Sequence, residues 1–366
     1  MSEELLASQA TEQQLFDQIT KMGHEQVVYC NDPETGLKAI IGIHNTVLGP
    51  ALGGTRMWAY NNESEALVDV LRLSRGMTFK AAISGLNLGG GKAVIIGDPK
   101  KLKNEALLRR FGKFVDSLGG KYITAEDVGM SEKDMTFLAM ETEHVTGLPE
   151  KLGGAGDPSP VTAFGTYMGM KASAKRVFGN DSLSGKTILV QGMGHVGANL
   201  VDLLAKENAN IIVSDIFEDK IKAVTDQHKV EVVDADSIFD VQMDIYAPCA
   251  LGATLNDDTI PRLTAKIVAG AANNQLANED IHGPMCQEQG ILYAPDFLIN
   301  AGGLMNVYGE LMGYPRDVVF TNAEGIYDTT LSIFDVSEKE GIHTQLAAMR
   351  LAQDRIEAVG KIKLPL

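Results

Sequence analysis

The sequence predicts an α/β protein of two domains. With 366 residues, the chain is long enough for two domains that each bury a core. Short apolar stretches alternate with helical patterns in both halves, which is typical of a sheet layered with helices. Glycine and proline cluster at 150–160, so we place 1–148 in a first domain and 149–339 in a second. The helix within 340–366 is expected to pack back on the first domain.

The composition narrows the class of protein. An apolar fraction of 45% and a charged fraction of 22% are ordinary for a globular protein. The net charge of -16 argues against a nucleic-acid or anionic-membrane partner, because both need basic patches. The acidic first residues do not resemble a signal peptide, and three isolated cysteines suit a reducing compartment and form no paired metal motif. We therefore expect a cytoplasmic protein without a metal site.

The first part of the chain predicts a helix followed by a hairpin. Apolar residues recur with helical spacing over 4–22. The apolar runs VVYC at 27–30 and LKAIIGIH at 37–44 flank the turn DPETG and predict a β-hairpin.

A glycine-rich segment, LGPALGGTRMW, follows at 48–58. It holds too many glycines to predict a regular element. Gly53 and Gly54 could expose backbone N–H groups to an anion, with Arg56 beside them. An ordinary structural loop is the alternative.

Two lysines stand out in the apolar, glycine-rich stretch 76–97. Lys80 falls inside a helical pattern, whereas Lys92 closes a run of three glycines and precedes the apolar run AVII. Burial at the entry of such a strand would lower the pKa of Lys92 and permit neutral-amine chemistry. The alternative is a glycine turn with a solvated lysine. A phosphate-binding P-loop is excluded, because Leu86 and Ala93 stand where glycine and a hydroxyl residue are required.

The segment YITAEDVGM at 122–130 predicts a short strand that ends in the acids Glu126 and Asp127. In open α/β sheets, a carboxylate at the carboxyl end of a strand often faces a ligand cleft. The alternative is that both acids only cap the helix expected from Ser131. If Asp127 and Lys92 share one site, each would shift the pKa of the other and they could pass protons.

The second half opens with the most specific local motif of the chain. After a helix that begins near Pro160, the strand TILV at 187–190 leads into GMGHVG at 192–197, then a helix and a second strand at 211–215. This order of elements is typical of a dinucleotide-binding fold. Its glycines permit a tight turn, close approach of a pyrophosphate and close helix packing, with the phosphates at the helix N-terminus.

An acid at the end of the second strand indicates which dinucleotide binds. Asp215 is placed to accept hydrogen bonds from the adenosine ribose hydroxyls. No arginine or lysine follows until Lys220, and an acid repels a 2′-phosphate, so NAD is favoured over NADP. His195 occupies a variable position of the turn and is expected to be a bystander.

Short apolar runs at 244–249, 266–272 and 291–295 predict further strands of a parallel sheet buried on both faces. Asn273 and Asn274 follow one of them, where their amides could bind a carboxylate or the nicotinamide ribose. The alternative is an asparagine-rich turn.

The chain is expected to end in helices. A helix that begins after Asn300 places Leu304 and Val307 on one apolar face, which usually means core packing. Two further helical patterns cover about 322–338 and 343–360.

Several of these segments together resemble one enzyme family. They are LGPALGGTRMW, GMTFKAAISGLNLGGGKAVIIGD, YITAEDVGM, GDPSPVTAFG, YAPCALGATLNDDTI, VAGAANNQL and YAPDFLINAGG. Over nearly the whole chain the sequence is similar to the glutamate/leucine/phenylalanine/valine dehydrogenases. The resemblance implies a substrate-binding and oligomerisation domain, a Rossmann-type NAD domain, and an active site in the cleft between them. It also implies a homo-oligomer that reversibly deaminates an L-amino acid to a 2-oxo acid and ammonia.

The resemblance further implies roles for individual residues. Lys80 would bind the substrate carboxylate with help from Gly53, Gly54 and Asn274. Lys92 would activate water, and Asp127 would exchange protons with the substrate amine. The positions of the side-chain pocket are Leu52, Ala125, Leu304 and Val307. The positions expected around NAD are Gly192, Met193, Gly194, His195, Val196, Gly197, Asp215, Thr162, Ala250 and Asn273.

The apolar side-chain pocket favours a branched aliphatic substrate, and the resemblance implies that L-leucine is preferred. A second carboxylate would be unpaired there, at a cost of several kcal/mol. A preference for phenylalanine or valine is the first alternative. Another is a non-catalytic NAD-binding regulator, which the presence of Lys80, Lys92 and Asp127 argues against.

Overall fold

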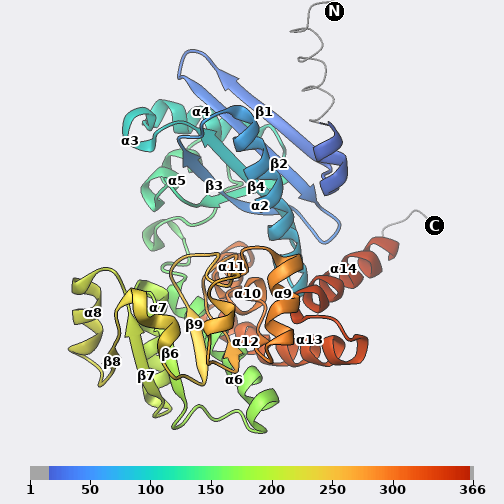
Figure 1. Cartoon of the computed structure of the whole chain (residues 1–366). Helices are drawn as coiled ribbons and strands as arrows, with labels where there is room; N and C mark the ends of the chain where they lie inside the picture. Colours follow the sequence, from blue (N-terminus) through green and yellow to red (C-terminus); the bar gives the residue numbers. More distant parts are fainter. Residues whose placement is uncertain (1–15, 363–366) are drawn as a thin grey trace, which may run out of the picture. The chain divides into compact units, whose positions relative to one another are not determined.

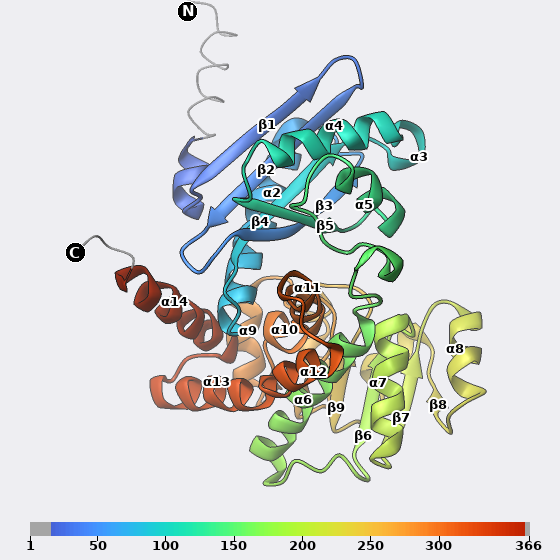
Figure 2. The same ribbon diagram turned by 180° about the vertical axis from the view of Figure 1, so that it is seen from behind.

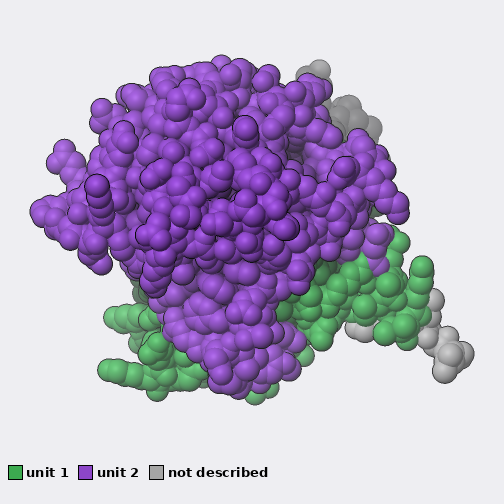
Figure 3. Space-filling view, turned by 90° about the horizontal axis from the view of Figure 1, so that it is seen from below, with its two compact units in different colours: residues 1–156, 355–366 green, residues 157–354 purple. Residues whose placement is uncertain are grey.

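The computed structural model describes residues 16–362. The chain divides into two compact units, coloured separately in Figure 3. Unit 1 contains the residues up to Gly156 and those from Arg355 onward, and unit 2 spans Asp157–Asp354. The domain boundaries expected from the sequence stay a prediction.

Unit 1 is built on a five-stranded mixed sheet in the order β1-β2-β4-β3-β5 (Figure 1). As expected, β1 and β2 form an antiparallel hairpin. β2 is also antiparallel to β4, whereas β3 runs parallel to both β4 and β5. The strands are β1 Gln26–Asp32, β2 Leu37–Asn45, β3 Ala51–Trp58, β4 Gly89–Ile96 and β5 Tyr122–Glu126.

The glycine-rich segment at 48–58 was expected to be irregular, and this prediction was wrong. Most of it is strand β3, which pairs on both sides inside the sheet. Sequence preference failed here because the glycines bring neighbouring backbones together instead of ending the strand.

Helices cover both faces of this sheet (Figures 1 and 2). Ile40 and Val94 pack in one core with α2, whereas Ile41 and Ile95 pack in another with α4 and α5. Side chains alternate along a strand, so Lys92 shares the α2 face with Val94. The helices are α2 Glu63–Ile83, α3 Pro99–Leu102, α4 Glu105–Asp116 and α5 Glu132–Ala139, and a short 3-10 turn covers Glu150–Leu152.

At the ends of the described chain, residues 16–22 are helical, and the rest of the helix expected at 4–22 lies outside the described residues. The last helix, α14, spans Thr344–Ile362. Near its end, the Arg355 guanidinium donates to the carbonyl oxygens of Ala82 at 2.9 Å and Leu86 at 2.8 Å. These bonds join α14 to the last turn of α2 and to the segment that follows it.

Unit 2 is built on a six-stranded sheet in the order β11-β10-β9-β6-β7-β8, with every pair parallel. From the β8 edge, the strands follow the order of a doubly wound dinucleotide-binding fold. The two-unit α/β fold class is therefore confirmed. The strands are β6 Thr187–Gln191, β7 Asn210–Ser214, β8 Glu231–Val232, β9 Ile245–Pro248, β10 Ile267–Val268 and β11 Leu292–Tyr293.

Several helices of unit 2 were not predicted individually from the sequence. The sequence predicted one helix at about 322–338, and the structure has a further helix, α12, before it. The helices are α6 Ser159–Phe178, α7 His195–Lys206, α8 Glu218–Thr225, α9 Glu279–Glu288, α10 Asp296–Ile299, α11 Gly302–Met312, α12 Arg316–Glu324 and α13 Ile326–Glu340, with 3-10 turns at Ala235–Asp240 and Ile260–Arg262. Across residues 16–362, we find no helix with the length and apolar character needed to cross a membrane.

Candidate active site

A buried lysine and a carboxylate meet on the α2 face of the unit 1 sheet. Lys92 lies in β4 and is only 7% exposed. Its Nζ lies 2.5 Å from Oδ2 of Asp127, which follows β5 directly. The structure therefore brings together the two residues to which the sequence assigned proton transfer. A short ion pair with little solvent around it interacts more strongly than an exposed pair.

The glycines before Lys92 are part of β4, so the alternative of a glycine turn that carries a solvated lysine is wrong. A Cβ atom at Gly91 would lie 2.7 Å from the ring of Tyr122. At Gly90 it would collide with the backbone of Thr78 in α2, and at Gly89 with the carbonyl of Asn45. These glycines let a helix and neighbouring chain segments approach β4 closely.

The glycines of β3 bring β4 and β5 close together. A Cβ atom at Gly53 would collide with the carbonyl oxygen of Gly91. At Gly54 it would lie 2.5 Å from the carbonyl oxygen of Glu126 and 2.9 Å from Cβ of Asp127. Glycine at this position therefore allows Asp127 to reach its place beside Lys92. A role of Gly53 and Gly54 in binding an anion stays a prediction.

Asp127 lies between two cations. Besides Lys92, Nε of Arg56 on β3 lies 3.3 Å from the same Oδ2 atom. Burial raises the pKa of the Asp127 carboxyl, but Lys92, Arg56 and the backbone N–H of Val128 more than offset it, so the net shift is downward. The alternative that Asp127 only caps the next helix is wrong, because Ser131 is the N-cap of α5.

The remaining residues assigned to the substrate in unit 1 lie around the same sheet face. Lys80 lies in the last turn of α2, two residues after Thr78, which contacts β4 at Gly90. Leu52 on β3 and Ala125 on β5 are buried, and their strand positions place them on the α2 face. Their roles in binding substrate stay predictions, as does that of Lys80.

Sequence reasoning missed part of this site. Arg56 was noted only as a neighbour of the β3 glycines, and its contact with Asp127 was not foreseen. Asp69 and Tyr60, which contact Arg56 or its partner, were not singled out. These residues are far apart in the sequence, and no local spacing reveals that strand pairing brings them together.

The glycine motif of unit 2 forms the turn between β6 and α7. Gly192 has a φ of +100°, a left-handed conformation that favours glycine, and a Cβ there would lie 2.7 Å from Cβ of Ala250. A Cβ at Gly197 would collide with the carbonyl of Gly192, so this glycine permits the helix to pack on the turn. Gly194, the N-cap of α7, has open space around the Cβ position. The first free N–H groups of α7 therefore border space that a phosphate can enter.

Asp215 is fixed at the end of β7. Its Oδ2 accepts from the backbone N–H of Met193 at 2.6 Å, and its Oδ1 accepts from Phe217 at 2.9 Å. It lines a cavity of about 340 Å³ that lies entirely within unit 2. Other lining residues are Gln191, Gly192, Gly194, Ser214, Lys220, Cys249, Ala250 and Leu251. The glycine turn, the acid and Ala250 are thus assembled around one cavity.

His195 and Val196 belong to the first turn of α7, and His195 has a largely exposed side chain. The expectation that His195 is a bystander to dinucleotide binding stays a prediction.

The polar residues of unit 2 that were assigned to ligand binding are fixed by contacts within the protein or by their backbone conformation. Asn273 Oδ1 accepts from Nδ2 of Asn300 at 2.8 Å. Asn274 has a φ of +53°, which is strained for a residue with a side chain. Thr162 donates its hydroxyl to the carbonyl of Pro158 at 3.0 Å. Sequence reasoning missed the buried Gln275, whose Nε2 donates to the carbonyl oxygens of Gly270 and Ala272, just before Asn273. The ligand roles of Asn273, Asn274 and Thr162 stay predictions.

The apolar residues assigned to the substrate in unit 2 lie on α11. Leu304 is 6% exposed, whereas Val307 is half-buried. Their membership of a substrate pocket stays a prediction.

Comparisons with known proteins assign the chain to a family. A model described as "Glu/Leu/Phe/Val dehydrogenase, dimerisation domain" matches residues 24–144, and one described as "Glutamate/Leucine/Phenylalanine/Valine dehydrogenase" matches 215–327. The leucine dehydrogenase of Thermoactinomyces intermedius is 54% identical over 95% of each chain. The valine dehydrogenase of Streptomyces coelicolor is 50% identical over 91% of this chain and 92% of its own.

A solved structure agrees with these sequence matches. The L-tryptophan dehydrogenase from Nostoc punctiforme superimposes with a TM-score of 0.85 at 46% identity, covering 94% of this chain and 99% of its own. A match over 95% of the chain extends across both units. The resemblance inferred from the sequence is thereby confirmed, and the chain belongs to the glutamate/leucine/phenylalanine/valine dehydrogenase family of amino acid dehydrogenases.

Proposed function

We propose that this enzyme catalyses the reversible, NAD-dependent oxidative deamination of L-leucine and other branched-chain L-amino acids to 2-oxo acids and ammonia. The observation that carries the proposal is the buried Lys92–Asp127 pair, at 2.5 Å, beside the apolar side chains of Leu52 and Ala125. Identities of 54% and 55% to two proteins named leucine dehydrogenase support the choice of substrate.

The turn between β6 and α7 fits a dinucleotide. Gly194 leaves open space at the N-terminus of α7, and Asp215 lines the adjoining cavity. An acid at this position suits a free ribose hydroxyl and disfavours a 2′-phosphate, which supports NAD over NADP. When NAD is bound, its nicotinamide accepts the hydride from the substrate Cα.

The residues of unit 1 account for the proton transfers. Asp127 accepts a proton from the substrate ammonium group, so that the amine is neutral when the Cα hydride leaves. The resulting iminium carbon is then attacked by water, from which Lys92 in its neutral form removes a proton. Collapse of the tetrahedral carbinolamine returns a proton to nitrogen and releases ammonia. Asp127 passes the accepted proton on to solvent, and its regained negative charge then stabilises the positive charge of the iminium group.

Lys80 binds the substrate carboxylate in this proposal, with Gly53, Gly54 and Asn274 assisting. We assign Leu52 and Ala125 of unit 1, and Leu304 and Val307 of unit 2, to recognition of the substrate side chain. In an apolar pocket one methylene changes discrimination by only about 1–3 kcal/mol, so leucine, isoleucine and valine should all react. A preference for phenylalanine or valine is the alternative within the same reaction.

The family model for residues 24–144 is described as a dimerisation domain, which supports assembly of the enzyme as a homo-oligomer through unit 1. All three cysteines of the chain are free thiols, which suits a reducing compartment and supports a cytoplasmic location.

The experiment that tests this function is a panel of L-amino acids assayed for kcat/KM by absorbance at 340 nm, with NAD and with NADP. We expect the highest value for L-leucine with NAD, and no measurable rate with L-glutamate. Phenylalanine as the best substrate would contradict the assigned preference. Absence of any amino-acid-dependent reduction would contradict the function itself.

A further inference from the structure

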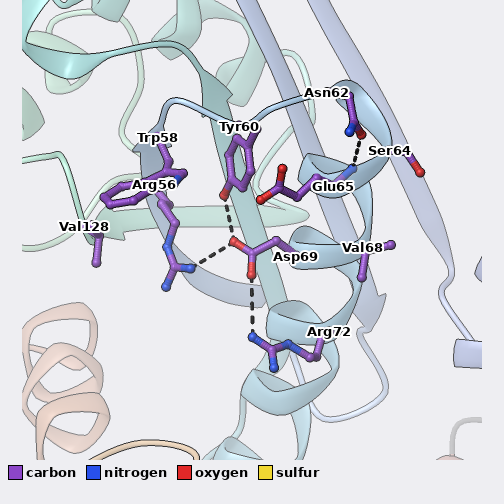
Figure 4. A pocket seen from close by; sticks show the side chains of 10 residues that line it. All are labelled: Arg56, Trp58, Tyr60, Asn62, Ser64, Glu65, Val68, Asp69, Arg72 and Val128. Carbon is purple, nitrogen blue, oxygen red and sulfur yellow. Dashed lines mark hydrogen bonds and ion pairs between the residues drawn. The ribbon is translucent and has the colours of Figure 1, made fainter. Parts of the chain in front are cut away.

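A chain of charged groups leads from the Lys92–Asp127 pair across the sheet to α2. Arg56 reaches Asp127 with Nε at 3.3 Å and Asp69 with Nη1 at 2.9 Å. Asp69 lies on α2, and its Oδ2 also accepts the hydroxyl of Tyr60 at 2.7 Å. Figure 4 shows Arg56 and Tyr60 converging on Asp69. Arg56 thus joins a carboxylate of the active site to a carboxylate of a helix.

These groups are partly shielded from water. The side chains of Arg56, Asp69 and Asp127 are 24%, 15% and 22% exposed. Asp69 and Tyr60 line a cavity of about 810 Å³ in unit 1 together with Arg56 and Val128, the residue that follows Asp127. Interactions among charges in such a site are screened less than on an open surface.

The guanidinium group has the geometry to fix direction as well as charge. Its five N–H donors lie in one rigid plane, so a contact at Nη1 restricts where Nε points. Asp69 holds Nη1, and Nε is therefore directed at Asp127. A lysine at the same place would supply charge without this constraint.

The proposed reaction requires Lys92 to give up its positive charge while Asp127 is beside it. Without another cation, loss of that charge would leave the half-buried Asp127 carboxylate unpaired and favour its protonation. Arg56 remains charged at every physiological pH. Burial lowers the pKa of the Arg56 guanidinium, but Asp127 and Asp69 reverse this and raise it overall.

Building on the proposed function, we propose that Arg56 is a positioning residue that keeps Asp127 ionised until it accepts the substrate proton and keeps it directed at Lys92, with Asp69 holding Arg56 in place. This role is separate from contact with the substrate, and it assigns a function to two residues outside the Lys92–Asp127 pair.

The groups that act on Asp127 come from several elements. Lys92 on β4 and Arg56 on β3 favour its ionised form, whereas the neighbouring acid Glu126 on β5 opposes it. Tyr122 on β5 is buried with a pKa raised by burial, so it stays neutral in the working range. Since Arg56 contributes to lowering the pKa of Asp127, its removal raises that pKa. Activity that requires the carboxylate must then be lost at a higher pH as the solution is acidified.

The test is the pH profile of kcat for L-leucine oxidation in wild type, Arg56→Gln, Arg56→Lys and Asp69→Asn. Arg56→Gln should lower kcat about 10–100-fold, the size of effect that loss of alignment produces, and should move the acid limb to higher pH. Arg56→Lys should keep the acid limb closer to wild type because the charge remains. Asp69→Asn should lower kcat and move the acid limb to higher pH, as Arg56→Gln does, but both effects should be smaller.

Arg110→Gln is the matched control, because Nε of Arg110 contacts Asp32 at 3.0 Å in unit 1, outside this network. Its profile should match that of wild type. A wild-type profile for Arg56→Gln would overturn the proposal, as would an equal loss at every pH with no movement of the acid limb. If Arg56→Gln does not fold, Asp69→Asn decides by the same criteria. An inactive wild type would instead contradict the proposed function.

Discussion

In unit 1 the glycines of β3 and β4 lie inside strands, whereas in unit 2 the glycines at 192–197 form the turn between β6 and α7. At Gly54 the space that a side chain would need is filled by Glu126 and Asp127 of the protein itself. At Gly194 that space is open. One glycine therefore lets Asp127 approach Lys92, and the other leaves room beside a helix N-terminus.

The two units also differ in how their sites are spread along the sequence. In unit 2 the turn and Asp215 belong to one strand–helix–strand sequence. In unit 1, Arg56, Asp69, Lys92 and Asp127 come from three different strands or their ends and from a helix. Local spacing in the sequence therefore identifies the unit 2 site. The residues of the unit 1 site come together only when the strands pair in the sheet. Substitutions should separate a unit 1 site that performs proton transfer from a unit 2 site that binds the dinucleotide.

The largest effect is expected for Lys92→Ala. Removal of a group that moves a proton should lower kcat about 10²–10⁴-fold, as is typical for general acid–base groups. Because the groups assigned to NAD lie in unit 2, the Kd for NAD, measured by fluorescence titration, should stay within about twofold of wild type. Unchanged turnover would contradict the role assigned to Lys92. Loss of NAD binding would contradict the assignment of proton transfer to unit 1 and of NAD binding to unit 2.

Gly54→Ala should destabilise the protein. The new methyl group would meet the backbone oxygen of Glu126, which cannot move freely, so we expect a loss of about 3 kcal/mol in the free energy of unfolding. Gly76→Ala is the matched control, since Gly76 lies within α2 with open space around it, and should stabilise by about 0.5–1 kcal/mol. Urea denaturation measures both. Equal stability of the two variants would contradict the close approach described for Gly54.

Gly194→Ala should show the opposite pattern. The open space at this position means that the protein loses at most about 1 kcal/mol, the cost of a poorer N-cap. A bound pyrophosphate would need the same space, so the Kd for NAD should rise roughly tenfold, equivalent to about 1.4 kcal/mol. Calorimetric titration with NAD measures this change. Wild-type affinity in a folded variant would exclude Gly194 from the phosphate site.

Asp215→Ala should mainly change which cofactor is used. Loss of the ribose hydrogen bonds lowers kcat/KM with NAD by about tenfold, and loss of the negative charge makes NADP less unfavourable. The measurement is the ratio of kcat/KM for the two cofactors at constant L-leucine. A ratio identical to that of wild type would show that Asp215 does not select NAD.

The sequence predicted most of the architecture because helical periodicity, hairpin signals and the glycine turn are local. It failed at β3, where Gly53 and Gly54 looked like a loop and instead allow strands to approach closely. It also missed the link between Arg56 and Asp69. No pattern in the sequence reports that link, because the strand register and the position of α2 against the sheet create it.

The most direct test of the central claim is a double-mutant cycle on kcat with Lys92→Gln and Asp127→Asn. If the two side chains act as one unit, the double variant should be about as slow as the slower single variant, because the second substitution has nothing left to disrupt. Losses that multiply in the double variant would mean that the two residues act independently, and would contradict the proposed paired function.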